Sequence, residues 1–185
     1  MSEEGRLGGQ SLFPQPCDKR APRPSFALRA ANPNDASAIA RLVKALAQYE
    51  RLAHEAEATA QDFHTALFGP TPRAHAMMAE IDGQAVGFAL WFYNFSTFKG
   101  RHGLYVEDVF VEPAHRGLGI GRAFFQALAA HALAEGCVRM EWSVLDWNEP
   151  ALRFYRSLAA EPMSEWTVQR LSGNALHALA ASGSH

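Results

Sequence analysis

The most informative segment of the chain is Leu104-Tyr-Val-Glu-Asp-Val-Phe-Val-Glu-Pro-Ala-His-Arg-Gly-Leu-Gly-Ile-Gly121. Its apolar first half predicts a strand over residues 104–111, Glu112-Pro113 predicts a turn, and the apolar spacing that follows predicts a helix over residues 119–135. Glycines let a backbone turn tightly and approach a ligand closely. A helix N-terminus presents unpaired N–H groups and a partial positive charge. Together these features predict a cradle for a pyrophosphate group.

The glycine spacing excludes two common phosphate-binding loops. Gly117, Gly119 and Gly121 do not match the G-x-G-x-x-G of a dinucleotide-binding loop, and the Gly-Lys-Ser/Thr of a Walker A loop is absent. The pattern that fits is R-x-x-G-x-G, from Arg116 to Gly121, between a strand and a helix. The alternative interpretation is a glycine-rich turn that binds nothing, and the strand and helix on either side favour phosphate binding over it.

The rest of the body alternates strand and helix patterns. Apolar residues at i, i+3, i+4 and i+7 mark helices, and the two apolar runs on either side of Asp82-Gly83 indicate a hairpin. The predicted strands are 26–29, 74–81, 84–95, 104–111, 138–144 and 167–171, and the predicted helices are 35–50, 59–68, 119–135, 149–159 and 173–181. This order, β-α-α-β-β-β-α-β-α-β, predicts an α/β (α+β) fold with a mixed, mostly antiparallel sheet flanked by helices on both faces.

Composition narrows the class of protein. The 185 residues predict one domain, residues 25–185, after a Pro- and Gly-rich tail, residues 1–24. The net charge of −2 argues against a nucleic-acid partner, and no apolar run is long enough to span a membrane. Cys17 and Cys137 are too few for a disulfide scaffold, and the eight histidines show no metal-ligand spacing, so no metal is expected. No secretory signal is evident, and we expect a soluble cytoplasmic protein.

A second motif follows the predicted strand 138–144. Asn148 stands at a helix start, and Pro150 lies in the first turn, where proline is tolerated. Asn148 and Tyr155 are seven residues apart, or two helical turns, so both can face the same side. A simple helix cap and a core aromatic side chain are the plainer interpretations of these two residues.

The combined motifs resemble those of the GNAT superfamily of N-acetyltransferases. Within it, the chain is similar to the spermidine/spermine (diamine) N-acetyltransferase family and most of all to its thialysine acetyltransferase branch. The resemblance covers roughly residues 25–180 and is carried by Leu46-Ala-Gln-Tyr-Glu50, Lys99-Gly-Arg101, Tyr105-Val-Glu-Asp-Val-Phe-Val111, Arg116–Gly121, Val144-Leu-Asp-Trp-Asn148 and Phe154-Tyr155. It implies a GNAT-like fold, acetyl-CoA as co-substrate, a small amine as acceptor and a homodimer.

The resemblance also implies roles for individual residues. Tyr155 would be the general acid that protonates the departing CoA thiolate, and Asn148 would contact the cofactor near the thioester. The backbone of Val109 and Val111 would bind the pantetheine arm and the acetyl carbonyl. The pyrophosphate would be held by Arg116, Gly117, Leu118, Gly119, Ile120, Gly121 and Arg122. The amine site would be lined by Tyr49, Glu50, Glu107, Asp108 and Trp166, with Phe98 where the family has tryptophan.

The chemistry of amine acetylation requires a proton acceptor. A free alkylamine has a pKa near 10.4, so only about one molecule in 2,500 is neutral at pH 7. Adjacent strand residues point to opposite faces unless a bulge intervenes, so only one of Glu107 and Asp108 should reach the amine directly. We favour Glu107, acting through water, because alternation gives it the face of Tyr105, Val109 and Val111. A solvated acidic pair is the plainer interpretation.

Three functions are consistent with the sequence. The first is acetyl transfer to a small diamine or amino-acid-like substrate, such as thialysine, lysine, ornithine or a polyamine. Ser96 and Thr97 stand where polyamine enzymes carry an extra acidic residue, which weakens the long-polyamine version. The second is a protein or peptide N-acetyltransferase, and the third is a non-catalytic acyl-CoA-binding module, which would not need Tyr155. The residues leave the identity of the amine open.

Overall fold

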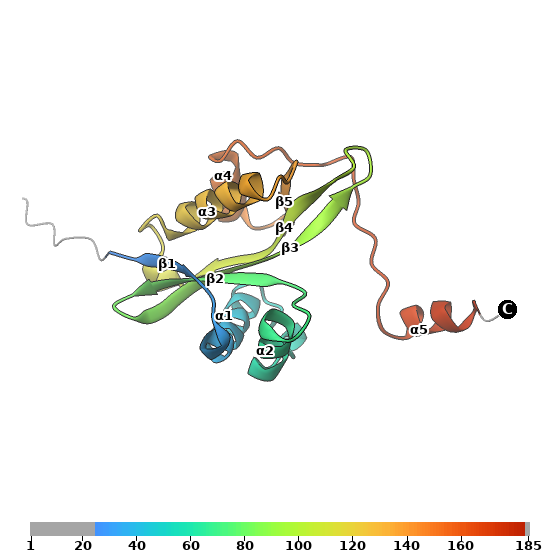
Figure 1. Cartoon of the computed structure of the whole chain (residues 1–185), viewed down its shortest axis with the longest axis horizontal. Helices are drawn as coiled ribbons and strands as arrows, with labels where there is room; N and C mark the ends of the chain where they lie inside the picture. The colour runs from blue at the N-terminus through green and yellow to red at the C-terminus, as the bar shows by residue number, and fades with distance from the viewer. Residues whose placement is uncertain (1–24, 184–185) are drawn as a thin grey trace, which may run out of the picture. The chain divides into compact units, whose positions relative to one another are not determined.

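The structure is a computed structural model that describes residues 25–183. The chain divides into two compact units, Met1–Ser143 and Val144–His185. The predicted tail, residues 1–24, and Cys17 within it lie outside the described residues. The first unit holds the sheet and three α-helices, and the second holds two further helices (Figure 1).

The sheet has five strands in the order β1-β2-β3-β4-β5. Their bounds are β1 (Ala27–Ala30), β2 (His75–Ile81), β3 (Gln84–Ser96), β4 (Arg101–Val111) and β5 (Met140–Trp142). All neighbours pair antiparallel except β4 and β5, which are parallel and joined through the crossover helix α3 (Ile120–Ala134). The predicted hairpin is confirmed, with Asp82 and Gly83 both at positive φ as a tight two-residue turn requires. The predicted mixed, mostly antiparallel sheet is therefore confirmed.

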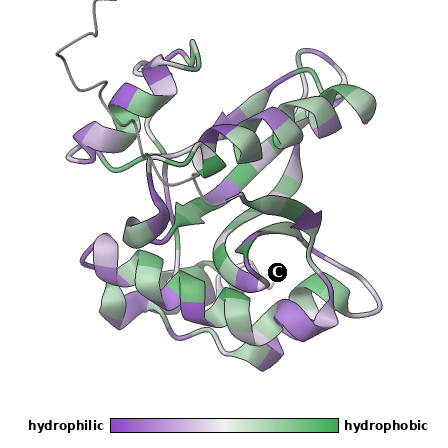
Figure 2. Cartoon of the chain, turned by 90° about the vertical axis from the view of Figure 1, so that its left-hand side faces the viewer, coloured by the Kyte–Doolittle hydropathy of each residue, from purple (hydrophilic) through white to green (hydrophobic). Residues whose placement is uncertain are grey.

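Helices cover both faces of this sheet, as predicted (Figure 1). On one face lie α1 (Ala36–Tyr49) and α2 (Ala60–Phe68), and on the other lies α3. The core under α1 and α2 contains Ile39, Leu42, Leu46, Leu67, Met78, Phe88, Leu90 and Phe110. The core under α3 contains Trp91, Leu104, Val106, Ile120, Phe124 and Leu128. Hydrophilic and hydrophobic residues are mixed on each helix (Figure 2), as expected for helices with one face against a core.

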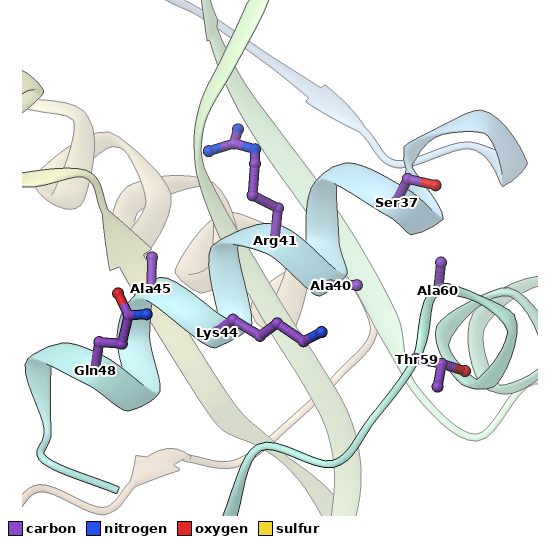
Figure 3. A pocket seen from close by; sticks show the side chains of 8 residues that line it. All are labelled: Ser37, Ala40, Arg41, Lys44, Ala45, Gln48, Thr59 and Ala60. Carbon is purple, nitrogen blue, oxygen red and sulfur yellow. The ribbon is translucent and has the colours of Figure 1, made fainter. Parts of the chain in front are cut away.

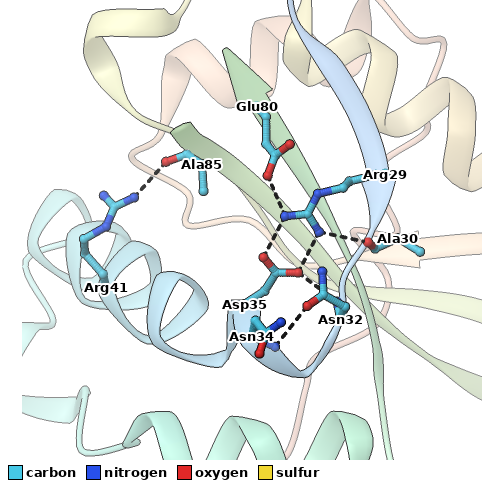
Figure 4. Close-up of polar contacts among 8 residues, drawn as sticks. All are labelled: Arg29, Ala30, Asn32, Asn34, Asp35, Arg41, Glu80 and Ala85. Atoms are coloured by element: carbon cyan, nitrogen blue, oxygen red, sulfur yellow. Dashed lines mark hydrogen bonds and ion pairs between the residues drawn. The ribbon is translucent and has the colours of Figure 1, made fainter. Parts of the chain in front are cut away.

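An ion-pair network ties β1 and β2 to the start of α1 (Figure 4). The Arg29 guanidinium donates to both carboxylate oxygens of Asp35, at 2.6 and 2.7 Å, and to Glu80 at 2.5 Å. Asp35 is buried and also accepts from the backbone N–H of Asn32. Hydrogen bonding to Arg29 lowers the pKa of Asp35, which keeps the carboxylate charged and the helix start fixed.

The second unit departs from the predictions at one element. It contains α4 (Glu149–Arg156) and α5 (Gly173–Ala181), both expected, but the predicted strand 167–171 is wrong. A strand needs a neighbour to pair its backbone groups, and every residue from 161 to 183 is exposed. In the first unit, the predicted strand 138–144 shortens to β5. The remaining short helices are the 3-10 turns η1 (Pro33–Asp35), η2 (Ala53–Glu55) and η3 (Pro113–His115).

Candidate active site

The glycine loop connects β4 to α3 through η3. Gly117 and Gly119 have φ of +81° and +92°, in the left-handed region, and Gly119 is the N-cap of α3. A Cβ added at either position would meet nothing within 4 Å, so the backbone conformation, and not a lack of space, calls for glycine. Within the described residues, no side chain caps the first N–H groups of α3. The helix start therefore has the features of an anion site.

Substitution of Gly119 by alanine should weaken CoA binding by about 10-fold, because a residue with a Cβ resists a φ of +92° and the loop must shift. Isothermal titration calorimetry with CoA measures this effect. Gly83→Ala is the matched control, since Gly83 also has a positive φ and open space around it but lies in the β2–β3 turn. Equal losses of CoA affinity in the two variants would show that the loop has no special role.

A β-bulge separates the two adjacent carboxylates of β4. Leu90 of β3 is paired with Asp108 and the next residue, Trp91, with Val106, so Glu107 is the extra residue without a partner on β3. Such a bulge bends the strand and breaks the strict alternation of side chains. Glu107 is exposed, whereas Asp108 is partly buried and is paired with Leu90 of the α1-side core.

The bulge means that the prediction of a shared face for Glu107, Tyr105, Val109 and Val111 is wrong. Val109 and Val111 pack with the core under α3, whereas Tyr105 stacks against Phe92 with ring centroids 5.1 Å apart. Phe92 neighbours Trp91, a residue of the α3-side core, and therefore points to the opposite face. Glu107 thus does not share one face with all three of these residues. Asp108, two residues before Phe110, lies on the α1 side.

Three carboxylates gather where α1 ends beside β4. Burial raises the pKa of Asp108 to about 7, with further contributions from the negative charges of Glu107 and Glu50. Burial also raises the pKa of Glu50, which is the C-cap residue of α1. None of the salt bridges within residues 25–183 involves any of the three. A partly buried negative cluster without a salt-bridge partner is a suitable site for a positively charged ligand.

The side chain of Arg116 lies against Tyr49, the residue before Glu50, and not against the start of α3. Its guanidinium carbon lies 4.4 Å from the centroid of the Tyr49 ring, and its Nε donates to the carbonyl oxygen of Val111 at 3.1 Å. Tyr49 is the last residue of α1 and packs against the core under that helix. No residue pattern predicts this contact, because it depends on how the loop folds back.

The edge of β4 that would face a pantetheine arm has little strand pairing. The parallel pairing with β5 involves only Leu104, Tyr105 and Val106. From Glu107 to Val111, the part of β4 that the structure describes has a strand neighbour only on the β3 side. Backbone groups on the other edge, including those around Val109, are therefore positioned to pair with an extended ligand.

Phe98 lies away from the acidic cluster. It is 92% exposed in the turn between β3 and β4. Asp108 comes seven residues after Arg101 in β4, a distance of roughly 20–24 Å of strand. Within the first unit, the structure therefore does not bring Phe98 together with Tyr49, Glu50 and Asp108.

The second unit carries the remaining predicted residues. Asn148 is buried and caps α4, accepting a hydrogen bond from the backbone N–H of Ala151 at 3.3 Å. Tyr155 lies partly buried in the last turn of α4, two turns from Asn148. Trp166 is 72% exposed in a segment without regular structure. The capping interpretation of Asn148 is thus confirmed, and a cofactor role for it stays a prediction.

A groove of about 560 Å³ lies between α1 and the start of α2 (Figure 3). It is lined by Ser37, Ala40, Arg41, Lys44, Ala45, Gln48, Thr59 and Ala60. None of these is a predicted site residue, and the acidic side chains that would attract an amine lie elsewhere. Among residues 25–183, no cluster of three or more metal-ligating side chains and no helix long and apolar enough to cross a membrane is found.

Comparisons with known proteins agree on one family. The Acetyltransferase (GNAT) family profile matches residues 39–159. The chain is 36% identical over 164 residues to thialysine N-epsilon-acetyltransferase of Bos taurus, covering 83% of this chain and 96% of the relative. It is 28% identical over 197 residues to L-ornithine N5-acetyltransferase NATA1 of Arabidopsis thaliana, covering 82% and 86%. Among solved structures, the integron cassette protein VCH_CASS6 of V. cholerae superposes with a TM-score of 0.72 at 27% identity, covering 84% and 98%.

Proposed function

The chain belongs to the GNAT acetyltransferase family, and we propose that it transfers the acetyl group of acetyl-CoA to a primary amine of a small diamine or amino-acid-like substrate. It is an N-acetyltransferase of the thialysine and spermidine/spermine-like branch. The relatives named for thialysine and for ornithine, both amino acids with a side-chain amine, support an acceptor of this kind.

One observation carries the substrate class. The carboxylates of Asp108, Glu50 and Glu107 lie close enough to repel one another, and none of them forms a salt bridge among the described residues. An ammonium group bound there would supply the missing counter-charge and would be held close to β4. Because β4 runs directly into the glycine loop, the amine and the cofactor would meet along the same strand.

Asp108 is the better-placed proton acceptor. An ordinary aspartate lies more than six pKa units below an alkylammonium of pKa about 10.4, whereas a carboxyl with a pKa of about 7 lies only about three units below it. This smaller gap makes proton transfer from the bound ammonium easier. Glu107, exposed at the bulge, would then pass the proton on through water, as the second carboxylate of the relay.

The later steps rest on the backbone of β4 and on α4. Attack by the neutral amine creates an oxyanion, which backbone N–H groups near Val109 would stabilise. Collapse expels the CoA thiolate, which Tyr155 would protonate as general acid, and the resulting phenolate would regain a proton as the acetylated nitrogen loses its second proton. The loop from Arg116 to Gly121, with Arg122, would hold the pyrophosphate through backbone N–H groups and the start of α3. Asn148 and Trp166 would complete the cofactor and amine sites.

We also propose that the enzyme is a cytoplasmic homodimer. Six large apolar side chains that follow α4 in the second unit are exposed, and a second copy is a suitable partner for them. They are Met163, Trp166, Val168, Leu171, Leu176 and Leu179. The segment predicted as strand 167–171 would gain the pairing that it lacks within the described residues. A single-chain mass by light scattering would contradict the dimer.

The direct test is CoA release from acetyl-CoA in the presence of individual amines. We expect turnover with one or more of thialysine, lysine, ornithine, putrescine and spermidine, and little with a lysine-containing peptide. A long polyamine should be a poorer substrate than a short amino acid, since Ser96 and Thr97 supply no distant negative charge. Turnover with the peptide alone would replace this proposal by protein acetylation, and CoA binding without turnover on any acceptor would favour an acyl-CoA-binding module.

A further inference from the structure

Arg116 has its backbone in the glycine loop and its side chain among residues of the amine site. The guanidinium carbon lies 4.4 Å from the centroid of the Tyr49 ring and 5.9 Å from that of Phe110. The Nε atom donates to the carbonyl oxygen of Val111 at 3.1 Å. These contacts fix the side chain at three points on the ends of α1 and β4.

The direction of these contacts is opposite to that needed by a phosphate ligand. Tyr49 and Phe110 belong to the core under α1. Helix α3, whose N-terminal N–H groups would bind the pyrophosphate, packs through Ile120 and Phe124 on the other face of the sheet. Arg116 therefore reaches toward α1, although its place in the R-x-x-G-x-G pattern predicted a phosphate contact.

We propose that the side chain of Arg116 positions the amine site and does not bind the pyrophosphate, which leaves its backbone N–H in the loop for that ligand. The planar guanidinium stacks on Tyr49 and holds the end of α1, with Glu50 as its next residue, against β4. Glu50 is thereby kept close to Asp108, where both carboxylates receive the ammonium. The proposal rests on the proposed function for the identity of the ligand, but the Arg116–Tyr49 contact itself does not.

The arrangement also links the two substrates. Ligand binding at the loop restrains the backbone of Arg116, and the side chain passes that restraint to Tyr49 and Glu50. Binding of CoA should therefore favour binding of the amine, and the amine should favour CoA by the same factor.

The test compares Arg116→Met with Arg122→Met, two arginines at the same loop. Arg116→Met should raise KM for the amine by about 3- to 30-fold, the size expected for a stacked cation, and should change the Kd for CoA by less than about 2-fold. Arg122→Met should do the reverse. A large rise in the CoA Kd of Arg116→Met, with an unchanged KM for the amine, would overturn the proposal.

A double-mutant cycle with Tyr49 separates positioning from a general structural effect. In a Tyr49→Phe background, which keeps the ring, Arg116→Met should have its full effect on KM for the amine. In a Tyr49→Leu background the effect of Arg116→Met on KM for the amine should vanish. If Arg116→Met raised this KM by the same factor in both backgrounds, the proposal would be overturned. If no amine is turned over, the proposed function fails, but the same cycle measured by thermal unfolding, together with CoA titration, still decides the role of Arg116. If the Arg116 and Tyr49 substitutions had additive effects on thermal unfolding, and Arg116→Met lost affinity for CoA, the proposed role of Arg116 would be refuted.

Discussion

Replacing Tyr155 with phenylalanine should lower kcat by about 10²- to 10⁴-fold, the usual contribution of a positioned general acid. A phenol of ordinary pKa near 10 is a slightly weaker acid than a thiol of pKa near 8.5, so proton transfer to the departing thiolate is uphill by only about 2 kcal/mol. This cost is small enough for partial transfer in the transition state. Steady-state kinetics on purified variant and parent enzyme measure the loss.

The phenylalanine variant should keep its affinity for CoA, because only the hydroxyl is removed from a partly buried side chain in α4. Phe154→Leu is a suitable matched control, since Phe154 is the neighbouring aromatic residue, with its ring 5.5 Å from that of Tyr155. We expect a smaller loss of kcat in that variant. Near-full activity of Tyr155→Phe would remove the hydroxyl from the mechanism.

Replacing Asp108 with asparagine should lower kcat/KM for the amine by about 10²-fold or more at neutral pH, through loss of the proton acceptor and of one negative charge. The parent enzyme should lose activity as the pH falls through about 7, because protonated Asp108 can neither bind the ammonium nor take its proton. This fall of activity at low pH, the acid limb of the pH–rate profile, should disappear in Asp108→Asn. In Glu107→Gln the limb should remain, with a smaller loss of rate. An acid limb that persists in Asp108→Asn but vanishes in Glu107→Gln would assign the base to Glu107.

Stability supplies an independent check on the same residue. The pKa of Asp108 is raised in the folded state, so its charged form is disfavoured there relative to the unfolded chain. The resulting penalty is absent below pH about 4, grows as the pH rises toward 7 and is complete above it. Asp108→Asn should therefore unfold at a higher temperature than the parent at pH 8 and at a similar temperature at pH 4. A more stable but less active variant is the expected sign of a functional residue that costs stability.

Much of the fold was predictable from the sequence because its signals are local. Apolar periodicity located α1 and α3, Gly69-Pro70 indicated the end of α2, and Asp82-Gly83 located the β2–β3 hairpin, since helix faces, helix ends and tight turns depend on neighbouring residues. The predicted strand 167–171 failed because a strand depends on a partner that residue patterns do not reveal.

The geometry of the loop was predictable, but the arrangement of the carboxylates was not. The glycine spacing predicted a turn that leads into a helix, which the positive φ of Gly117 and Gly119 at the start of α3 confirms. Phosphate binding by this loop and cation binding at Glu107-Asp108 stay predictions. The bulge at Glu107 reversed the expected faces, because one extra residue changes the side-chain direction of everything after it. The contact between Arg116 and Tyr49 joins residues far apart in the chain, so it follows from the folded loop alone.

The most direct test of acetyl transfer to a small amine is a competition experiment with limiting labelled acetyl-CoA. Equal concentrations of thialysine, lysine, ornithine, spermidine and a lysine-containing peptide are mixed with the enzyme, and mass spectrometry identifies the acetylated products. We expect the label on the side-chain amine of a small amino acid, in at least about 100-fold excess over the peptide, because the acidic cluster at Asp108 and Glu50 binds a compact cation. Label found mainly on the peptide, or consumed with no acetylated amine, would contradict the account.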